Sequence, residues 1–330
     1  MLELYPYDAG KGDCLRIRFP GESGTYHNIL VDSGTPRFGK TFAAICGGII
    51  SFGEAIDMVI ITHVDEDHLG GLLYMVKNQI PLKSSTVVMN HPLAIPAVDG
   101  NADTPLSLAQ NDMIFRALSA QGVNVKGALR GEVMDLDGAR LHILNPTPLK
   151  FEALFGTAEA NIPLGIRDNR PVVLEVLMEQ RLPCEDASSN NGASIVFVLE
   201  YAGKRLLFTG DAGAGDILDG LSLYMETQRT EKPIPFDAVK LPHHGSAGNI
   251  SETWPDALQS QRYIICADGK PHPDKLTVAK LLKWYGAVEV ISARDWWEDG
   301  YFSQRDVEQY IVPKRLSLRH MKGDAITWQT

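Results

Sequence analysis

Residues 58–71 read MVIITHVDEDHLGG, so that an apolar run is followed by His63, Asp65, Asp67 and His68. The run predicts a buried strand, and the glycines after the second histidine belong to the start of a helix. Such a junction can aim all four side chains at one point, and imidazole and carboxylate groups bind divalent metals. A solvated loop with Asp67 as a helix N-cap is the alternative, but it does not explain two histidines flanking two aspartates. The stretch therefore predicts a metal site at a strand end.

Short β-branched runs and helix-like stretches alternate along the rest of the chain. The predicted strands cover residues 29–31, 58–61, 87–89, 141–144, 194–199, 205–208, 238–241, 262–266 and 288–291. The predicted helices cover 41–52, 69–77, 106–121, 216–227 and 274–285. This mixture of hairpins and strand-to-helix steps predicts an α/β protein in which helices cover layers of sheet.

A predicted hairpin carries a second candidate ligand. The runs SIVFVLE and RLLFTGD are joined by the polar turn at 201–204, and the second run delivers Asp211 to a strand end. A strand-end aspartate is usually a turn residue or a helix cap. Beside the 58–71 motif, Asp211 is a candidate bridging ligand.

Two later segments also place histidines after predicted strands. In KLPHHGS, one of His243 and His244 could donate a proton or contact a phosphate while the other packs or orients it. Ser246 and the backbone N–H groups of the same turn could bind phosphate oxygens. The segment CADGKPHP places His272 after another strand end, where a lone histidine is as often structural as functional.

Composition limits the class of protein. The chain has 330 residues, a formal net charge of −10 and four cysteines without C-x-x-C spacing. A disulfide framework is therefore not expected, and a broad nucleic-acid-binding surface would need an excess of basic residues. The acidic start and the lack of a long apolar run argue against a signal peptide and against a membrane span. We expect a cytoplasmic protein.

These motifs together resemble the metallo-β-lactamase fold superfamily, and within it the hydrolase domain attached to bacterial competence DNA-uptake channel proteins. In that branch H-x-D-x-D-H replaces the commoner H-x-H-x-D-H. The matching segments, in their order along the chain, are 8–14 (DAGKGDC), 29–34 (ILVDSG), 63–71 (HVDEDHLGG), 190–194 (NNGAS), 243–246 (HHGS) and 323–327 (GDAIT).

The resemblance implies a four-layer αββα sandwich with a dinuclear metal site. We expect one domain over residues 1–330, with the Pro-, Asn- and Gly-rich stretch 146–191 as an insertion or cap. The implied ligands are His63 and Asp65 for the first metal, Asp67, His68 and His272 for the second, and Asp211 between them. Asp32 would orient a ligand histidine.

One position departs from the family pattern. Most members supply a further histidine to the first metal, whereas this chain has Asn190 in the equivalent position. Asn is a weaker ligand, so the first site is expected to be labile or to favour Mn²⁺ over Zn²⁺. His142 is an alternative donor, although its place within a predicted strand favours an ordinary packed or surface histidine.

The resemblance implies a hydrolase that uses two divalent ions, zinc or manganese, and a metal-bridged hydroxide. The HHGS turn favours a phosphodiester substrate, nucleic acid or nucleotide, with Asp67, His243 and His244 as catalytic residues and Ser246 at the substrate. One alternative is a hydrolase of small esters, lactones or amides. Another is a partner-binding module with a degenerate metal site, for which Asn190 and the Trp-rich segment 295–298 argue. A protein partner or homo-oligomer stays open.

Overall fold

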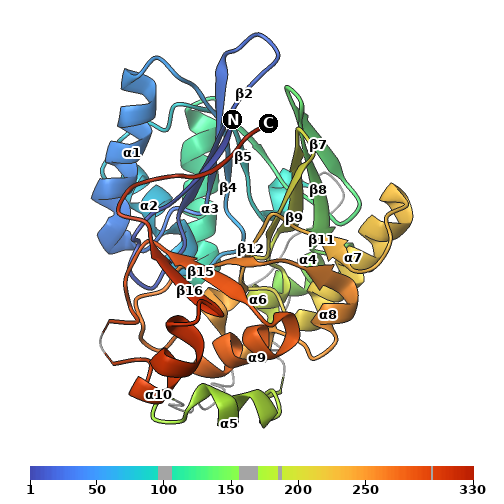
Figure 1. Ribbon diagram of the computed structural model, residues 1–330. Helices are drawn as coiled ribbons and strands as arrows, with labels where there is room; N and C mark the ends of the chain where they lie inside the picture. The colour runs from blue at the N-terminus through green and yellow to red at the C-terminus, as the bar shows by residue number, and fades with distance from the viewer. Residues whose placement is uncertain (96–105, 156–169, 185–187, 299) are drawn as a thin grey trace.

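The computed structural model describes residues 1–95, 106–155, 170–184, 188–298 and 300–330, and it contains two large mixed sheets (Figure 1). The first has the order β17 (Ile326–Trp328), β1 (Leu2–Pro6), β2 (Leu15–Pro20), β3 (Tyr26–Val31), β4 (Ile56–Ile60), β5 (Ser84–Val88) and β6 (Asn124–Lys126). The second has the order β16 (Leu316–His320), β15 (Val288–Ser292), β14 (Arg262–Ile264), β12 (Ala238–Lys240), β10 (Lys204–Phe208), β9 (Val196–Tyr201), β8 (Ala139–Asn145) and β7 (Val133–Leu136). A small parallel pair joins β11 (Ile234–Pro235) to β13 (Leu258–Gln259).

Helices cover the outer faces of both sheets, which makes four layers. The first sheet packs against α1 (Gly39–Ser51), α2 (Glu66–Lys77) and α3 (Leu106–Ala120) through one apolar cluster. The second packs through another against α5 (Leu174–Glu179), α7 (Ala214–Gln228), α8 (Trp254–Ala257) and α9 (Lys275–Tyr285). A third cluster fills the space between the sheets. The predicted αββα architecture is confirmed (Figure 1).

Shorter elements complete the chain. The remaining α-helices are α4 (Pro148–Leu154), α6 (Ser189–Gly192) and α10 (Gln304–Asp306), and a single π turn, η5 (Val307–Ile311), follows α10. The 3₁₀ turns are η1 (Pro36–Phe38), η2 (Pro92–Ala94), η3 (His243–Gly245) and η4 (Ala247–Asn249).

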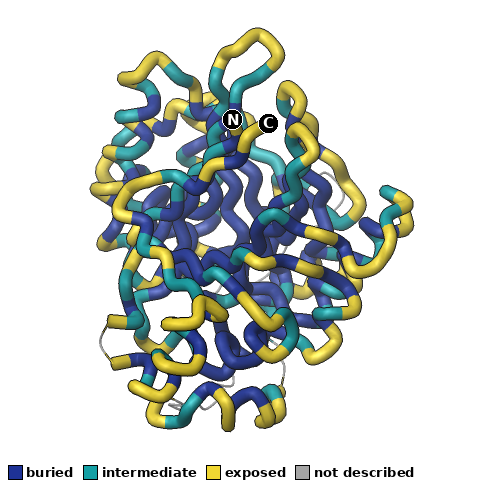
Figure 2. Tube along the Cα trace, viewed as in Figure 1, coloured by how far each residue is buried: buried dark blue, intermediate teal, exposed yellow. Residues whose placement is uncertain are grey.

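The burial pattern of each strand explains whether the strand was predicted from the sequence. In β3 to β5 both faces are covered, so Leu30 packs toward the helices while Ile29 packs toward the second sheet. Such strands are continuous apolar runs. In β2, by contrast, Ile17 is buried while Arg16 and Arg18 alternate with it and pair with a glutamate on the other face. Because β1 and β2 alternate in this way, they were not among the strands predicted from continuous apolar runs. Figure 2 shows the strands as the most deeply buried part of the fold.

The topology brings the ends of several parallel strands to one edge. β3 and β4 are parallel, as are β10, β12 and β14. The two sheets meet there, because the Ile195 amide donates to the Thr62 carbonyl (2.8 Å) and the Asn90 side chain donates to the Ala193 carbonyl (2.7 Å). In layered α/β folds the carboxyl ends of strands are where ligands bind. The segments 29–34, 63–71 and 243–246 each include or follow such a strand end.

The predicted insertion lies partly outside the described residues. Its described part forms α4, α5 and α6, and residues 156–169 and 185–187 fall outside. The boundaries 146–191 stay a prediction. In the part of the chain that is described, no helix is both long enough and apolar enough to cross a membrane.

A buried ion pair ties α5, α9 and α10 together. The Asp306 carboxylate accepts from the Lys275 ammonium (2.7 Å) and from the Leu174 amide (2.7 Å), and both charged side chains are fully buried. Removing one partner of a buried pair leaves an uncompensated charge.

We expect Asp306→Ala to lower the free energy of unfolding by about 3–5 kcal/mol, measured by urea denaturation. The exposed pair between Glu179 and Lys283 is the control, and Glu179→Ala should cost under about 1 kcal/mol. Equal losses in the two variants would contradict the assignment.

His27 joins the two sheets at the end opposite the strand-end edge. Its Nδ1 lies 3.0 Å from Asp57 of β4, and its Nε2 lies 2.8 Å from Asp137 in the turn after β7. Burial alone would lower the pKa of His27, but hydrogen bonds to the two carboxylates outweigh it and raise the pKa. A raised folded-state pKa stabilises the fold below the unfolded value and loses that effect as pH rises through the folded value. We therefore expect His27→Asn to be more destabilising at about pH 5.5 than at about pH 9, by urea denaturation. A pH-independent loss would contradict this.

Candidate metal centre

Four strand ends deliver the side chains of the centre. Asp32 follows β3, His63 follows β4, Asp211 follows β10 and His244 follows β12. His68 lies in the first turn of α2, which returns to the same edge. All five are at least nine-tenths buried.

Several imidazoles converge on one carboxylate oxygen. Oδ2 of Asp211 lies 3.5 Å from Nε2 of His68, 3.5 Å from Nε2 of His244, 3.8 Å from Nε2 of His243 and 3.9 Å from Nε2 of His63. These distances are too long for hydrogen bonds. Two ligands that bind one metal at 2.0–2.2 Å with tetrahedral angles are about 3.3–3.6 Å apart, so the spacing suits groups that share a cation.

The buried nitrogens support the same interpretation. Within the described residues, Nε2 of His63 and Nε2 of His68 have no hydrogen-bond partner although each is enclosed. Oδ1 of Asp211 also lacks one there. Buried polar atoms are normally satisfied, so such a group calls for a ligand. The mixed imidazole and carboxylate donors fit a divalent ion.

The two remaining aspartates of the motif lie at the rim. Oδ2 of Asp65 is 3.6 Å from Nε2 of His63, and Oδ2 of Asp67 is 3.7 Å from Nε2 of His244. Asn190 of α6 donates from Nδ2 to Oδ1 of Asp65 (2.7 Å). The amide of Asn190 therefore faces a carboxylate and holds it in place.

The carboxylate of Asp32 contacts Nδ1 of His68, on the side of the ring away from Asp211. Oδ2 of Asp32 lies 2.9 Å from Nδ1 of His68, and Oδ1 of Asp32 accepts from the Thr62 amide (2.7 Å). Asp32 has a φ of 58°, in the left-handed region that non-glycine residues rarely adopt. The contact directs Nε2 of His68 toward Asp211. Carboxylates that orient ligand imidazoles in this way are common around metals.

Sequence reasoning did not assign a role to Asp13 or Lys240, which the structure brings to the centre. Oδ1 of Asp13 lies 3.0 Å from Nδ1 of His244, and Oδ2 forms an ion pair with Nζ of Lys240. One ligand-type atom from each of Asp13, His68, Asp211 and His244 lies within 4.8 Å of the others. Both residues lie inside segments that were noted for other reasons, DAGKGDC and KLPHHGS. A charged residue without an assigned role inside each of these motifs was therefore the sequence signal that could have identified them.

The charges of the cluster are strongly coupled. Burial alone would raise the pKa of Asp211, but His68, His244 and His243 hold it well below its usual range. Burial would likewise lower the pKa of His68, whereas Asp211 and Asp32 hold it well above its usual value. Burial would raise the pKa of Asp13, yet Lys240 and His244 keep it below the usual range. The carboxylates of Asp211 and Asp13 therefore stay ionised, which is the state that binds a cation, whereas His68 would release a proton when a metal binds its Nε2.

The remaining predicted residues lie beside the centre. The ring of His272 is 5.1 Å from that of His243, and Nδ1 of His272 is 3.7 Å from Asp274. His243 is more exposed than His244, with side-chain exposures of 29% and 7%. Ser246 is buried, and its hydroxyl accepts from the Gly248 amide (3.2 Å) as a local cap. The geometry thus brings His244 to Asp211 and Asp67 and places His272 next to His243.

Three other features lie apart from the centre. His142 in β8 contacts Glu200 (3.1 Å), as expected for a packed histidine. Trp296 is buried against Tyr301, with ring centroids 4.7 Å apart, so it is part of the core.

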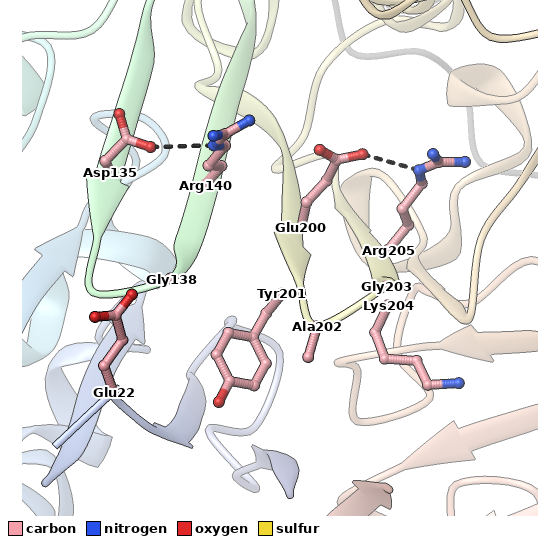
Figure 3. A pocket seen from close by; sticks show the side chains of 10 residues that line it. All are labelled: Glu22, Asp135, Gly138, Arg140, Glu200, Tyr201, Ala202, Gly203, Lys204 and Arg205. Atoms are coloured by element: carbon pink, nitrogen blue, oxygen red, sulfur yellow. Dashed lines mark hydrogen bonds and ion pairs between the residues drawn. The ribbon is translucent and has the colours of Figure 1, made fainter. Parts of the chain in front are cut away.

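A polar groove of about 480 Å³ lies at the turns after β7 and β9, where Asp135 pairs with Arg140 and Glu200 pairs with Arg205 (Figure 3). None of the residues that line it belongs to the candidate metal centre.

Comparison with known proteins gives one sequence relative and several structural ones. No family model matches the chain. The chain is 24% identical over 297 residues to ComE operon protein 3 of Bacillus subtilis (strain 168), a match that covers 85% of this chain and 30% of that protein. The chain therefore spans less than a third of that relative's length. The four-layer architecture is the one that the predicted resemblance implied, and this match is consistent with that resemblance.

Solved structures also align over most of the chain. Zn²⁺-bound PqqB from Methylobacterium extorquens is 13% identical, with 95% of this chain and 87% of that chain covered and a TM-score of 0.43. The metallo-β-lactamase fold protein YhfI from Bacillus subtilis is 9% identical, with 99% and 100% covered and a TM-score of 0.42. A diphosphatase of the PhnP family is 12% identical, with 99% and 98% covered and a TM-score of 0.41.

The convergence on Asp211 predicts that divalent ion binding depends on it. We expect Asp211→Ala to weaken Zn²⁺ or Mn²⁺ binding by more than about 100-fold, the upper end for residues that only support a ligand. Binding is measured by competition with a chelating dye, and metal content is measured after gel filtration. Asp219→Ala, on the exposed side of α7, is the matched control and should bind as the wild type does. Unchanged affinity in Asp211→Ala would contradict a metal centre at this point.

Proposed function

We propose that this protein is a metal-dependent hydrolase that cleaves phosphodiester bonds at the centre around Asp211. The observation that carries the proposal is the convergence of buried imidazole nitrogens on one carboxylate oxygen, at spacings suited to shared cations. When bound, two divalent ions would activate water and offset the charge of a phosphate. Side chains of this protein would hold the ions, contact the substrate and protonate the leaving group.

The residues present fit a pair of ions. His63 and Asp65 would hold the first, His68, Asp67 and His244 the second, and Asp211 would contact both. His244 takes the place that the sequence prediction assigned to His272, because Nε2 of His244 lies within 4 Å of both Asp67 and Asp211. Asn190 supports the first site through Asp65 rather than by replacing the missing histidine. A first site with fewer imidazoles is expected to be weaker and to favour Mn²⁺.

In this assignment His243 and His272 are not metal ligands, although Nε2 of His243 lies 3.8 Å from Oδ2 of Asp211, and their rings lie next to one another. We assign His243 to the substrate, where its imidazole would contact a phosphate oxygen or protonate the leaving group. Its partial exposure gives a substrate access that the buried His244 lacks. His272 would support it from 5.1 Å away, measured between ring centroids. Ser246 would bind substrate only if its hydroxyl hydrogen, which the Gly248 contact does not use, points outward.

A phosphodiester is favoured over a small ester or lactone by this extra histidine. Hydrolysis of an activated carbonyl needs little help for its leaving group, whereas an alkoxide leaving from phosphorus benefits from a nearby acid. Nucleic acid and nucleotide substrates share this chemistry. The alternative of a binding module with a lost metal site draws less support, because Trp296 of the Trp-rich segment is buried in the core.

Turnover of bis(p-nitrophenyl) phosphate by protein loaded separately with Mn²⁺ and Zn²⁺ tests the proposal. We expect metal-dependent turnover in the wild type. His243→Asn should keep its metal and lose activity by about 100-fold or more on a dinucleotide, whose leaving group is an alkoxide, and by much less on bis(p-nitrophenyl) phosphate, whose phenolate leaving group needs little protonation. His244→Asn should lose metal as well.

Metal content measured on the same samples separates the outcomes. Retained metal with no phosphodiester turnover, together with activity on a lactone or thioester panel, would move the assignment to carbonyl substrates. Retained metal in His244→Asn with loss in His272→Asn would restore the ligand set predicted from the sequence.

A further inference from the structure

Two buried charges behind the metal centre have no part in the function proposed so far. Asp13 is 1% exposed and Lys240 is 2% exposed, and their side chains form an ion pair. Burying such a pair is costly unless the geometry is good and further hydrogen bonds are made. What sets this pair apart from the buried pair of Asp306 and Lys275 is its place at the centre, where Asp13 contacts His244.

Asp13 lies on the opposite side of the imidazole from the metal-binding position. It approaches Nδ1 of His244 (3.0 Å) and Nδ1 of His68 (3.9 Å), whereas Asp211 approaches Nε2 of both rings. The carbonyl of Cys266 also lies 2.9 Å from Nδ1 of His244. A carboxylate and a carbonyl can only accept, so Nδ1 of His244 must donate.

Lys240 connects this carboxylate to the bridging one. Its ammonium pairs with Asp13, donates to the Gly210 carbonyl (3.1 Å) and lies 3.8 Å from Oδ1 of Asp211. It is thus a fixed cation between two carboxylates. It holds Asp13 in the acceptor position for His244, and it reduces the negative charge that ions at Asp211 would otherwise have to offset alone.

The loop that carries Asp13 is anchored to the metal-binding motif. The Asp13 amide donates to the Asp67 carbonyl (3.2 Å), and a Cβ at Gly12 would lie 2.1 Å from that same oxygen. Only glycine allows this approach. The N-terminal segment is therefore docked onto the start of α2, next to the residues it would position.

We propose that Asp13 and Lys240 are positioning residues of the metal centre. Asp13 fixes the orientation of His244 so that Nε2 faces Asp211 and Asp67, and Lys240 fixes Asp13. The inference rests on the proposed function, because it takes His244 as a metal ligand. Residues that support a ligand in this way typically change metal affinity 10- to 100-fold.

The test compares Asp13→Asn, Lys240→Met and the double variant with the wild type. Zn²⁺ affinity is measured by competition with a chelating dye, the unfolding midpoint is measured in urea, and the visible spectrum is recorded with Co²⁺. Each single variant leaves one buried charge unpaired and should lose both stability and affinity. The double variant removes both charges, so its midpoint should recover. Its Zn²⁺ affinity should stay about 10- to 100-fold below the wild type, with an altered Co²⁺ spectrum.

The buried pair between Asp306 and Lys275 provides the matched control. Asp306→Asn, Lys275→Met and their double variant should change stability in the same pattern and leave Zn²⁺ affinity unchanged. Recovery of wild-type affinity and spectrum in Asp13→Asn/Lys240→Met would overturn the positioning role while leaving the metal centre intact. A wild type that binds no Zn²⁺, Mn²⁺ or Co²⁺ would instead overturn the proposed function itself, and this inference with it.

Discussion

Mutual attraction between buried carboxylates and imidazoles at one sheet edge is the constraint on which the rest of the structure depends. Asp211 stands at its centre, nearly without solvent contact, with histidine nitrogens at 3.5–3.9 Å. An isolated charge in such a place would be costly, so each carboxylate needs a fixed cationic or hydrogen-bonding partner. Asp32 has His68 and Thr62, and Asp13 has His244 and Lys240. The Nε2 atoms of His63 and His68 have no hydrogen-bond partner among the described residues, and both approach Oδ2 of Asp211.

The layered fold makes this possible because parallel strands end together. β3 and β4 from one sheet and β10 and β12 from the other reach the same edge, and direct hydrogen bonds join the sheets there. Left-handed backbone at Asp32, His243 and His244, with φ between 45° and 58°, turns these side chains back over the strand ends. Such conformations cost free energy and persist only where surrounding contacts hold them. The apolar clusters on either side of each sheet supply those contacts.

The histidines differ in the groups that contact the two nitrogens of each ring. His68 and His244 each have a carboxylate at Nδ1, so their Nε2 atoms are directed at Asp211. His243 and His272 are instead next to one another, and His243 keeps some exposure. Asn190, which the resemblance places where most members have a ligand histidine, donates its amide to Asp65. In the proposed site it would act through the position of Asp65.

The sequence by itself determined the fold class, nine of the strands, the five longest of the described helices, and the motifs that place His63, His68 and Asp211 at strand ends. Those features are local, since the period of apolar residues and the turn residues at strand ends reflect neighbours a few positions away. Strands with one exposed face, such as β2, were missed because the prediction used continuous apolar runs, whereas β2 alternates apolar and polar residues. Which of His244 and His272 faces Asp211, and that Asp13 and Lys240 lie behind the centre, only the tertiary structure decided. Asp13 and His244 are 231 positions apart, and no local pattern encodes a contact that depends on how two sheets pack.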